Sequence, residues 1–262
     1  MRQAKIPQNL MRDKMPLNNY KGSDLMLELQ NITWSTPDGE QILKGVSFTV
    51  PDNRLVAVTG PNGGGKTTIA KLIAGIEKPA SGRILLDGED ITEANVTERA
   101  RKGISYAFQQ PVRFKGLTVS DLIRLSAGEN RTEENLCAVL SKVGLCAREY
   151  IDREVNSALS GGEIKRIEIA TVLERPSKLA VFDEPEAGID LWSFNSLISV
   201  FDELRQKQDK TLVIISHQER ILSVADEIVV ISGGEVKSHG SREEILPSLL
   251  NDGVRSGCPQ MK

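Results

Sequence analysis

The sequence has few cysteines and no marked excess of either charge. Its three cysteines, Cys137, Cys146 and Cys258, cannot all pair with one another and lack the spacing of metal ligands, so we expect them to be small apolar residues kept reduced. Lysine and arginine number 33 against 36 aspartate and glutamate, a net charge of −3. This balance gives no global electrostatic case for nucleic-acid binding.

Long apolar runs are also missing. No stretch approaches the length that spans a bilayer, and no charged start, apolar middle and small-residue cleavage site indicate a signal peptide. We therefore expect a soluble, cytoplasmic protein. The 262 residues suit one domain with a sizeable core. Residues 1–25 sustain no apolar period and predict a flexible N-terminal extension.

The most informative segment is a glycine-rich turn that follows the apolar run Leu55–Val58 and precedes a helix-like run. Strand, glycine turn and helix in this order are typical of a phosphate-binding P-loop. Glycines reach dihedral angles closed to other residues and bring N–H groups close to phosphate oxygens. The lysine adds positive charge for the outer phosphates, and the threonine after it offers a hydroxyl to Mg²⁺. The nucleotide-binding candidates here are Gly60, Pro61, Asn62, Gly63, Gly64, Gly65, Lys66, Thr67 and Thr68.

The segments around this turn predict a mixed α/β organisation. Strand-like runs at 27–34 and 45–50 predict antiparallel β structure before the P-loop strand, and residues 112–155 predict a mainly helical insertion. Gln109 follows an apolar run at 104–108. It faces the phosphates only if that strand lies beside the P-loop strand, which the residues alone leave open.

Two further segments place polar groups at the ends of regular elements. Ser160, Gly161 and Gly162 precede a helical run, where they suit either ordinary capping or contact with an anion, and the residues alone do not decide between the two. Asp183 and Glu184 end an apolar strand, where ligands bind in open α/β sheets. Asp183 can hold Mg²⁺ and Glu184 can deprotonate an attacking water.

His217 ends a later strand in the same way. A lone histidine in that position is more often structural than catalytic.

Taken together and in order, these motifs resemble the nucleotide-binding domain of the ABC ATPase superfamily over residues 26–245. The resemblance implies an α/β fold: a P-loop NTPase (RecA-like) core with an antiparallel β subdomain, a helical signature subdomain inserted at about 111–172, and a C-terminal tail at 246–262. It implies ATP and Mg²⁺ as cofactors, with Thr67, Gln109 and Asp183 at the metal.

The resemblance also implies catalytic roles. Lys66, Gln109, Glu184 and His217 are the implied catalytic residues, with Glu184 as the base and His217 as the switch histidine. Ala187–Asp190 corresponds to the D-loop, with Asp190 among the nucleotide-binding residues. In the superfamily two copies pair head to tail, so Ser160 and its glycines are expected to close over ATP bound to the P-loop of the second copy.

Finer features are most similar to SufC-type ATPases, the ATPase subunits of the SUF iron–sulfur cluster assembly machinery. They are the segments 107–112, 160–166 and 216–222. This similarity implies SufB/SufD-like scaffold partners and no membrane partner. The segment 185–190 is closer to that of transporter ATPases, so the ATP-binding subunit of a membrane transporter stays open as the alternative. A nucleotide-gated clamp without turnover is a third hypothesis, which Glu184 argues against.

The residue that would stack on adenine departs from the superfamily pattern. Spacing places Thr36 where many transporter ATPases have an aromatic residue. Trp34 lies two positions earlier and would point to the same face of a strand, so it can substitute. The sequence therefore predicts triphosphate binding more firmly than a strict preference for ATP.

Overall fold

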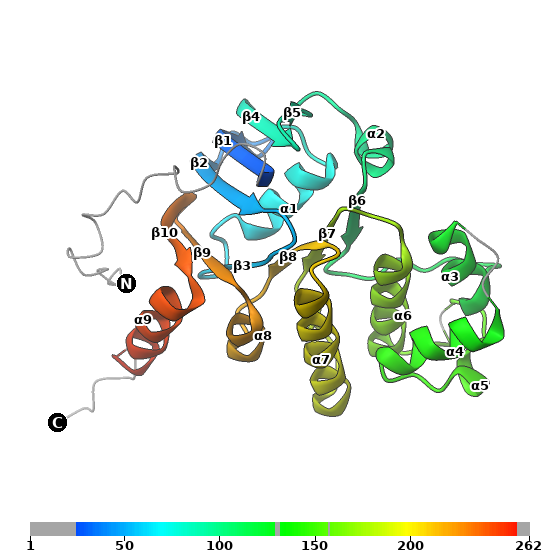
Figure 1. Ribbon diagram of the computed structural model, residues 1–262. Coiled ribbons are helices and arrows are strands. Elements are labelled where there is room, and N and C mark those ends of the chain that lie inside the picture. The colour runs from blue at the N-terminus through cyan, green and yellow to red at the C-terminus, as the bar shows by residue number, and fades with distance from the viewer. Residues whose placement is uncertain (1–24, 129–131, 157, 256–262) are drawn as a thin grey trace.

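The computed structural model describes residues 25–128, 132–156 and 158–255, whose strands form two sheets (Figure 1). The first sheet has the order β2-β1-β4-β5 and is antiparallel. Its strands are β1 (Leu25–Ser35), β2 (Gln41–Pro51), β4 (Ser81–Leu86) and β5 (Glu89–Asp90). The antiparallel structure predicted before the P-loop is therefore present. The N-terminal extension predicted for residues 1–25 lies almost wholly outside the described residues.

The second sheet carries the site and has the order β10-β9-β3-β8-β7-β6. All its neighbouring pairs are parallel except the hairpin of β9 and β10. Strands β3, β7 and β8 are buried along their whole length, as expected for parallel strands covered on both faces. The six strands are β3 (Leu55–Thr59), β6 (Ile104–Ala107), β7 (Leu179–Asp183), β8 (Thr211–Ile215), β9 (Glu227–Ser232) and β10 (Glu235–Ser241).

Helix α1 (Lys66–Ala74) packs in one apolar cluster with both sheets. Ile69, Leu72 and Ile73 of this helix are fully buried in it. Helix α2 (Val96–Arg101) lies at the end of α1, where the buried Arg99 side chain donates to the carbonyls of Leu72 and Ile73. The P-loop helix is thus held at its C-terminal end by a guanidinium group.

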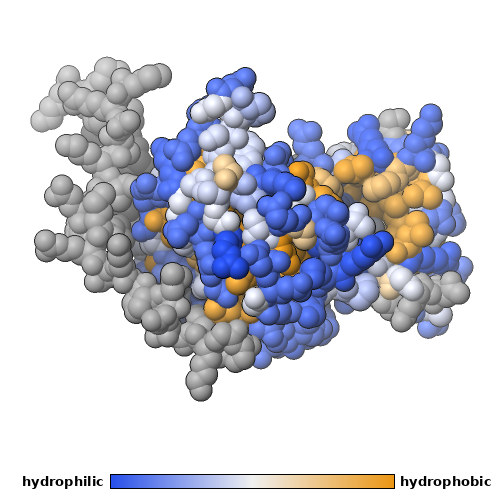
Figure 2. Space-filling view, turned by 90° about the horizontal axis from the view of Figure 1, so that it is seen from above, coloured by the Kyte–Doolittle hydropathy of each residue, from blue (hydrophilic) through white to orange (hydrophobic). Residues whose placement is uncertain are grey.

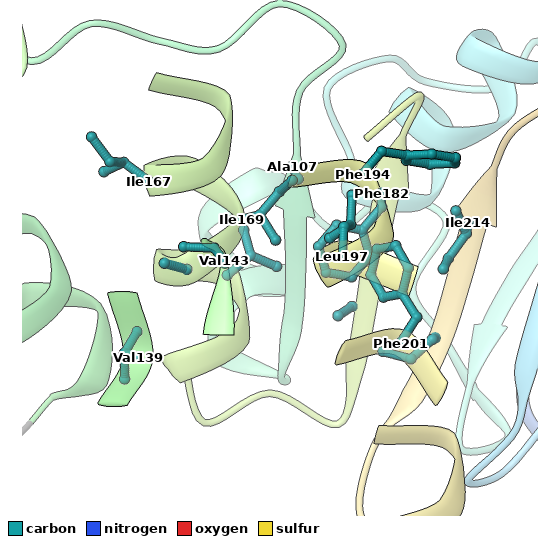
Figure 3. Close-up of a cluster of buried hydrophobic side chains, with 14 of the residues drawn as sticks. Ala107, Val139, Val143, Ile167, Ile169, Phe182, Phe194, Leu197, Phe201 and Ile214 are labelled. Carbon is teal, nitrogen blue, oxygen red and sulfur yellow. The ribbon is translucent and has the colours of Figure 1, made fainter. Parts of the chain in front are cut away.

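The other face of the parallel sheet is covered by helices. A second apolar cluster joins the sheet to these helices, and Figure 3 shows part of it. Phe182 of β7 meets Phe201 of α7 (Leu191–Lys207) edge to face, with ring centroids 5.1 Å apart. The helices are α3 (Val119–Ala127), α4 (Glu133–Lys142), α5 (Ala147–Tyr150), α6 (Gly161–Glu174), α7 (Leu191–Lys207), α8 (Glu219–Val224) and α9 (Arg242–Arg255).

The helical insertion lies to one side of the sheets, with α3, α4 and α5 beside α6 (Figure 1). It was expected to be helical from residue 112, but residues 108–118 form a loop and the first helix begins at Val119. Thr118 caps that helix in a capping box with Asp121, which sets its start. At the other end of the chain, α9 extends past residue 245, the expected end of the ATP-binding domain. Ile245, Leu246 and Leu249 of this helix pack on the apolar cluster that joins the parallel sheet to the helices.

Of the helices that the structure describes, none combines the length and the apolar character needed to cross a membrane.

Candidate nucleotide-binding and hydrolysis site

The P-loop connects β3 to α1 through glycines that no other residue could replace without strain. Gly60 has φ +137°, and a β-carbon there would lie 1.9 Å from the carbonyl oxygen of Ile231. Gly65 has φ +97° and stands at the N-cap of α1, where no side chain among the described residues caps the helix. The first-turn N–H groups of α1 are therefore available to an anion, at the positive end of the helix dipole.

Lys66 lies inside this loop. Its Nζ donates to the carbonyls of Gly60 at 2.8 Å and Pro61 at 3.0 Å. Burial lowers the pKa of Lys66, while the carboxylates of Glu184 and Asp183 act in the opposite direction. The loop thus places a desolvated ammonium group between its own backbone and two acidic side chains, where it can bind phosphate oxygens.

Thr67 and Asp183 face each other across the loop. The Oγ1 of Thr67 donates to Oδ1 of Asp183 at 3.2 Å, and the hydroxyl of Tyr106 donates to Oδ2 at 3.2 Å. Asp183 is fully buried at the end of β7. Burial raises its pKa, and the two hydrogen bonds oppose that rise. Tyr106 was not predicted from the sequence because it belongs to no motif. Its place near the end of β6, two residues before Phe108, is the only sequence feature that could have indicated a site residue there.

The chemistry of Thr67 and Asp183 fits Mg²⁺. Hydroxyl and carboxylate oxygens are its preferred protein ligands, and Mg²⁺ on nucleotide phosphates needs only one or two of them. Consistently, within the described ranges no group of three or more His, Cys, Asp and Glu side chains could hold a metal ion by itself.

Gln109 and Glu184 lie in contact, although the strand before Gln109 does not lie beside the P-loop strand. Strand β6 lies at the edge of the sheet, separated from β3 by β8 and β7, so the condition that it lie beside the P-loop strand is not met. Gln109 instead reaches the site from the loop beyond β6, where its Nε2 donates to Oε2 of Glu184 at 2.8 Å. Glu184 has a positive φ of 45°, an uncommon backbone state that often marks a functional site.

His217 follows β8, which is the direct neighbour of β3. The residue before it, Ser216, donates from Oγ to Oε1 of Glu186 at 2.5 Å. Burial raises the pKa of Glu186, and the hydrogen bond from Ser216 opposes that rise. This contact ties the loop after Glu184 to the loop that carries His217.

One open pocket of about 530 Å³ collects most of these groups. It is lined by P-loop residues, by Gln109, Glu184 and His217, and on one side by Trp34 of β1, Thr36 just after that strand, and Ile42 of β2. Trp34 is half-buried. The predicted substitute for the adenine-stacking aromatic residue therefore does line the pocket. The P-loop residues in its wall are Asn62, Gly63, Gly65, Lys66, Thr67 and Thr68.

The signature segment lies elsewhere. Ser160 forms a capping box with Glu163: Oγ of Ser160 accepts from the Glu163 N–H, and Oε2 of Glu163 accepts from the Ser160 N–H at 2.6 Å. The hydroxyl of Tyr150 also donates to Glu163. Capping chemistry is thus present, and it leaves the N–H groups of Gly161 and Gly162 for any anion. None of these residues lines the P-loop pocket of the same chain.

Asp190 is likewise outside the pocket. It is the N-cap of α7 and accepts hydrogen bonds from the backbone of Trp192 and Ser193. The loop before it touches the signature, because a β-carbon on Gly162 would lie 2.7 Å from the carbonyl oxygen of Gly188. The signature and the D-loop candidate therefore form a second surface, separate from the P-loop pocket.

Comparison with known proteins agrees with this arrangement. A family model described as ABC transporter matches residues 43–187. An uncharacterised ABC transporter ATP-binding protein of Methanocaldococcus jannaschii is 42% identical over 213 residues, covering 78% of this chain and 85% of the relative. An energy-coupling factor transporter ATP-binding protein of Ureaplasma parvum is 34% identical over 227 residues, covering 86% of this chain and 77% of that protein.

Solved structures show the same fold. A dimeric ATP-binding cassette in a post-hydrolysis state, bound to ADP and Pi, superposes with a TM-score of 0.73 at 25% identity, covering 83% of this chain and 99% of that one. A bacterial Atm1-family ABC exporter with ATP bound gives a TM-score of 0.77 at 25% identity; the match covers 90% of this chain but 43% of the exporter chain. The chain therefore belongs to the ABC transporter ATP-binding family and is an ABC-type ATP hydrolase.

Proposed function

We propose that this protein is the ATP-binding subunit of an ABC membrane transporter, which couples ATP hydrolysis in a pair of copies to movement of a permease. The relatives reported above are described as transporter ATP-binding proteins. That description, together with an exposed apolar surface beside Gln109, carries the proposal.

In this proposal the P-loop holds the nucleotide. The glycines offer N–H groups to the phosphates, Lys66 neutralises the outer phosphates, and Trp34 stacks on the base. Thr67 and Asp183 would hold Mg²⁺, together with Gln109. Bound there, the ion would draw charge from the phosphate oxygens during transfer.

Glu184 acts as the general base. Its carboxylate takes a proton from the water that attacks the terminal phosphate, and the 2.8 Å bond from Gln109 keeps that carboxylate oriented. His217, at the end of the neighbouring strand, donates to an oxygen of the phosphate that leaves. Lys66 remains on the phosphates throughout and stabilises the charge that develops.

The signature acts on a second copy of the chain. Ser160, Gly161 and Gly162 lie outside the pocket of their own chain, and the start of α6 has two N–H groups and a positive dipole end to offer. A head-to-tail pair would bring this surface, with Asp190 beside it, over the nucleotide of the partner copy. Dimeric association is described for a solved cassette of the same fold.

The partner surface lies on the helical side of the molecule. Exposed large apolar side chains occur at Phe108, Val112 and Phe114 in the loop after β6 and at Leu125 on α3, which is 69% exposed. Figure 2 shows apolar surface over this helical end. Exposed apolar groups of this size favour contact with another protein. Because Phe108 adjoins Gln109, a partner bound there would lie next to the hydrolysis site.

A SUF-type assembly ATPase is the second candidate. It is favoured by the segments 107–112, 160–166 and 216–222, which are similar to SufC-type sequences. In that case the same apolar surface would bind a SufB/SufD-like scaffold protein instead of a permease. The relatives' descriptions favour the permease over such a scaffold.

Purification of a tagged chain from its source cells separates the two candidates. A multi-span membrane protein that co-purifies and raises ATP turnover supports the transporter, and a β-rich scaffold protein that does so supports the SUF complex. The double variant Phe114→Ser/Leu125→Ser is expected to lose either partner, whereas Ile76→Ser, at another exposed apolar residue, keeps it. In all cases Lys66→Ala is expected to abolish turnover, and unchanged turnover would contradict the role given to the P-loop.

A further inference from the structure

A buried ion pair on α6 has no task in the proposed function. The Lys165 side chain is fully buried, the Glu168 side chain is 11% exposed, and Nζ of Lys165 lies 3.4 Å from Oε2 of Glu168. Burial lowers the pKa of Lys165 and raises that of Glu168, so both charges are held in the fold at a cost. Since such pairs are weak sources of stability, this one calls for another explanation.

Both members of the pair bind the backbone just before Gln109. The N–H of Phe108 donates to Oε1 of Glu168 at 3.0 Å, and Nζ of Lys165 donates to the carbonyl of Phe108 and, at 3.4 Å, to that of Gln109. The N–H and the carbonyl of Phe108 are thus bound by two side chains of opposite charge on the same helix. Charge-assisted hydrogen bonds of this kind are stronger than neutral ones.

The segment held in this way leads directly to the hydrolysis site. The Gln109 side chain continues from the braced backbone to Oε2 of Glu184. The Phe108 side chain packs edge to face on Tyr106, but 39% of Phe108 is still exposed to solvent. One short segment therefore connects α6, an exposed aromatic ring and the candidate base.

We propose that Lys165 and Glu168 are positioning residues for ATP hydrolysis, which fix the backbone at Phe108 and Gln109 so that the Gln109 amide meets the Glu184 carboxylate. The proposal rests on the roles given above to Gln109 and Glu184. Because α6 begins at the signature, the contacts of Lys165 and Glu168 also make the position of Gln109 depend on the helix that would contact the second copy. Neither residue touches the reacting atoms itself.

A purely structural pair would behave differently from a positioning pair, and Lys210 supplies the matched control. Lys210 is a half-buried lysine outside α6, and its Nζ donates to the carbonyls of Leu173 and Arg175 at the far end of that helix. Lys210→Met therefore removes another ammonium group that hydrogen-bonds to α6, without removing a contact of Phe108. Lys210→Met and the double variant Lys165→Met/Glu168→Leu are both expected to lower the melting temperature, but only the double variant should alter hydrolysis.

The first measurement is amide hydrogen exchange in the full chain, on a peptide that contains Phe108. The double variant Lys165→Met/Glu168→Leu removes both charges together. It is expected to raise the exchange rate of the Phe108 amide tenfold or more, because that amide loses one charge-assisted hydrogen bond. Glu168→Gln keeps an oxygen that can accept from the Phe108 N–H and should exchange close to the parent. Lys210→Met should match the parent.

The second measurement is steady-state ATP turnover of the same variants. The double variant is expected to lower kcat about tenfold with the KM for ATP within about twofold of the parent, because displaced catalytic groups slow the chemical step while the P-loop still binds. Glu168→Gln should recover most of kcat. Should the double variant fail to fold, the comparison of Glu168→Leu with Glu168→Gln gives the same two outcomes.

Two results would contradict the positioning role of Lys165 and Glu168. One is an unchanged exchange rate at Phe108 in the double variant; the other is an unchanged kcat of the double variant although Gln109→Ala lowers kcat. Gln109→Ala also tests the proposed function separately. If that variant hydrolyses ATP at the parental rate, the role given to Gln109 is wrong, and exchange at Phe108 alone then decides whether Lys165 and Glu168 hold the loop.

Discussion

Gln109 and Glu184 are 75 positions apart in the chain, and a 2.8 Å hydrogen bond joins Nε2 of the first to Oε2 of the second. The bond crosses from the loop after β6 to the end of β7, and these two strands are neighbours in the sheet. It holds one carboxylate oxygen of Glu184 and leaves the other for a water molecule. Loss of this carboxylate should therefore affect proton transfer directly.

The first prediction concerns Glu184→Gln. Removing the base should lower kcat at least about a hundredfold while ATP still binds, and ATP should then hold two copies together. Light scattering after size-exclusion chromatography in ATP measures the dimer, and phosphate release measures turnover. Glu219→Gln, at an exposed carboxylate of α8, is the control and should behave as the parent. Parental turnover in Glu184→Gln would refute the base assignment.

The second prediction concerns Trp34, which lines the pocket. The chain has two tryptophans, and the other, Trp192, is 81% exposed, so Trp192→Phe leaves Trp34 as the only tryptophan signal. ATP should change its fluorescence. Trp34→Ala should weaken ATP binding roughly 5–30-fold, equal to about 1–2 kcal/mol of base stacking.

Inorganic tripolyphosphate is the matched ligand for this test, because it has the phosphates without a base. Its affinity should be the same with or without Trp34. An equal loss of affinity for ATP and tripolyphosphate in Trp34→Ala would mean that Trp34 supports the P-loop and does not contact the base.

The third prediction concerns Arg99, which is fully buried and donates to four backbone carbonyls, those of Leu72, Ile73, Thr92 and Ala94. Arg99→Ala leaves them without this partner and opens a cavity at the end of α1. We expect a loss of about 3 kcal/mol or more in the free energy of unfolding, or about 6–12 °C in melting temperature. Arg101→Ala, exposed on the same helix, should change stability little; equal effects of the two would contradict the capping role of Arg99.

The fourth prediction is a pH dependence from Glu186, whose pKa burial raises. Above its folded pKa the buried carboxylate is charged and costs stability; as the pH falls through that pKa toward the unfolded value, the carboxylate gains a proton and the cost disappears. Glu186→Gln should therefore stabilise the protein more at pH 8 than at pH 5, as measured by the melting temperatures of parent and variant at each pH. A gain that stays constant across this range would show that charge is not the cause.

Motifs whose chemistry depends on neighbouring residues could be predicted from the sequence. The P-loop is of this kind, because its glycines, Lys66 and Thr67 act through the backbone that they belong to. Trp34 was also predicted as a pocket residue, since alternation along a strand fixes which side chains share a face.

Contacts that depend on strand order could not be predicted. Gln109 reaches Glu184 although β6 is not beside β3, and no pattern in the chain gives the order β3-β8-β7-β6. Lys165 and Glu168 were missed for a related reason: charged residues on a helix ordinarily indicate its exposed face, and here they point inward to the Phe108 backbone. Only the packing of α6 against the loop after β6 reveals them.

In the proposed function, each chain carries two halves of different sites: the P-loop of one copy works with the signature of another. Mixing two inactive variants tests it directly. Lys66→Ala removes the P-loop function and Ser160→Arg blocks the signature, so each alone should lack turnover. In a mixed head-to-tail pair, the intact P-loop of one chain meets the intact signature of the other, so one of the two sites works. Because about half of the pairs in an equal mixture are mixed, roughly a quarter of parental activity should return. A mixture as inactive as its components, with mixed pairs demonstrated by co-purification, would contradict the pairing of one copy's P-loop with the other copy's signature.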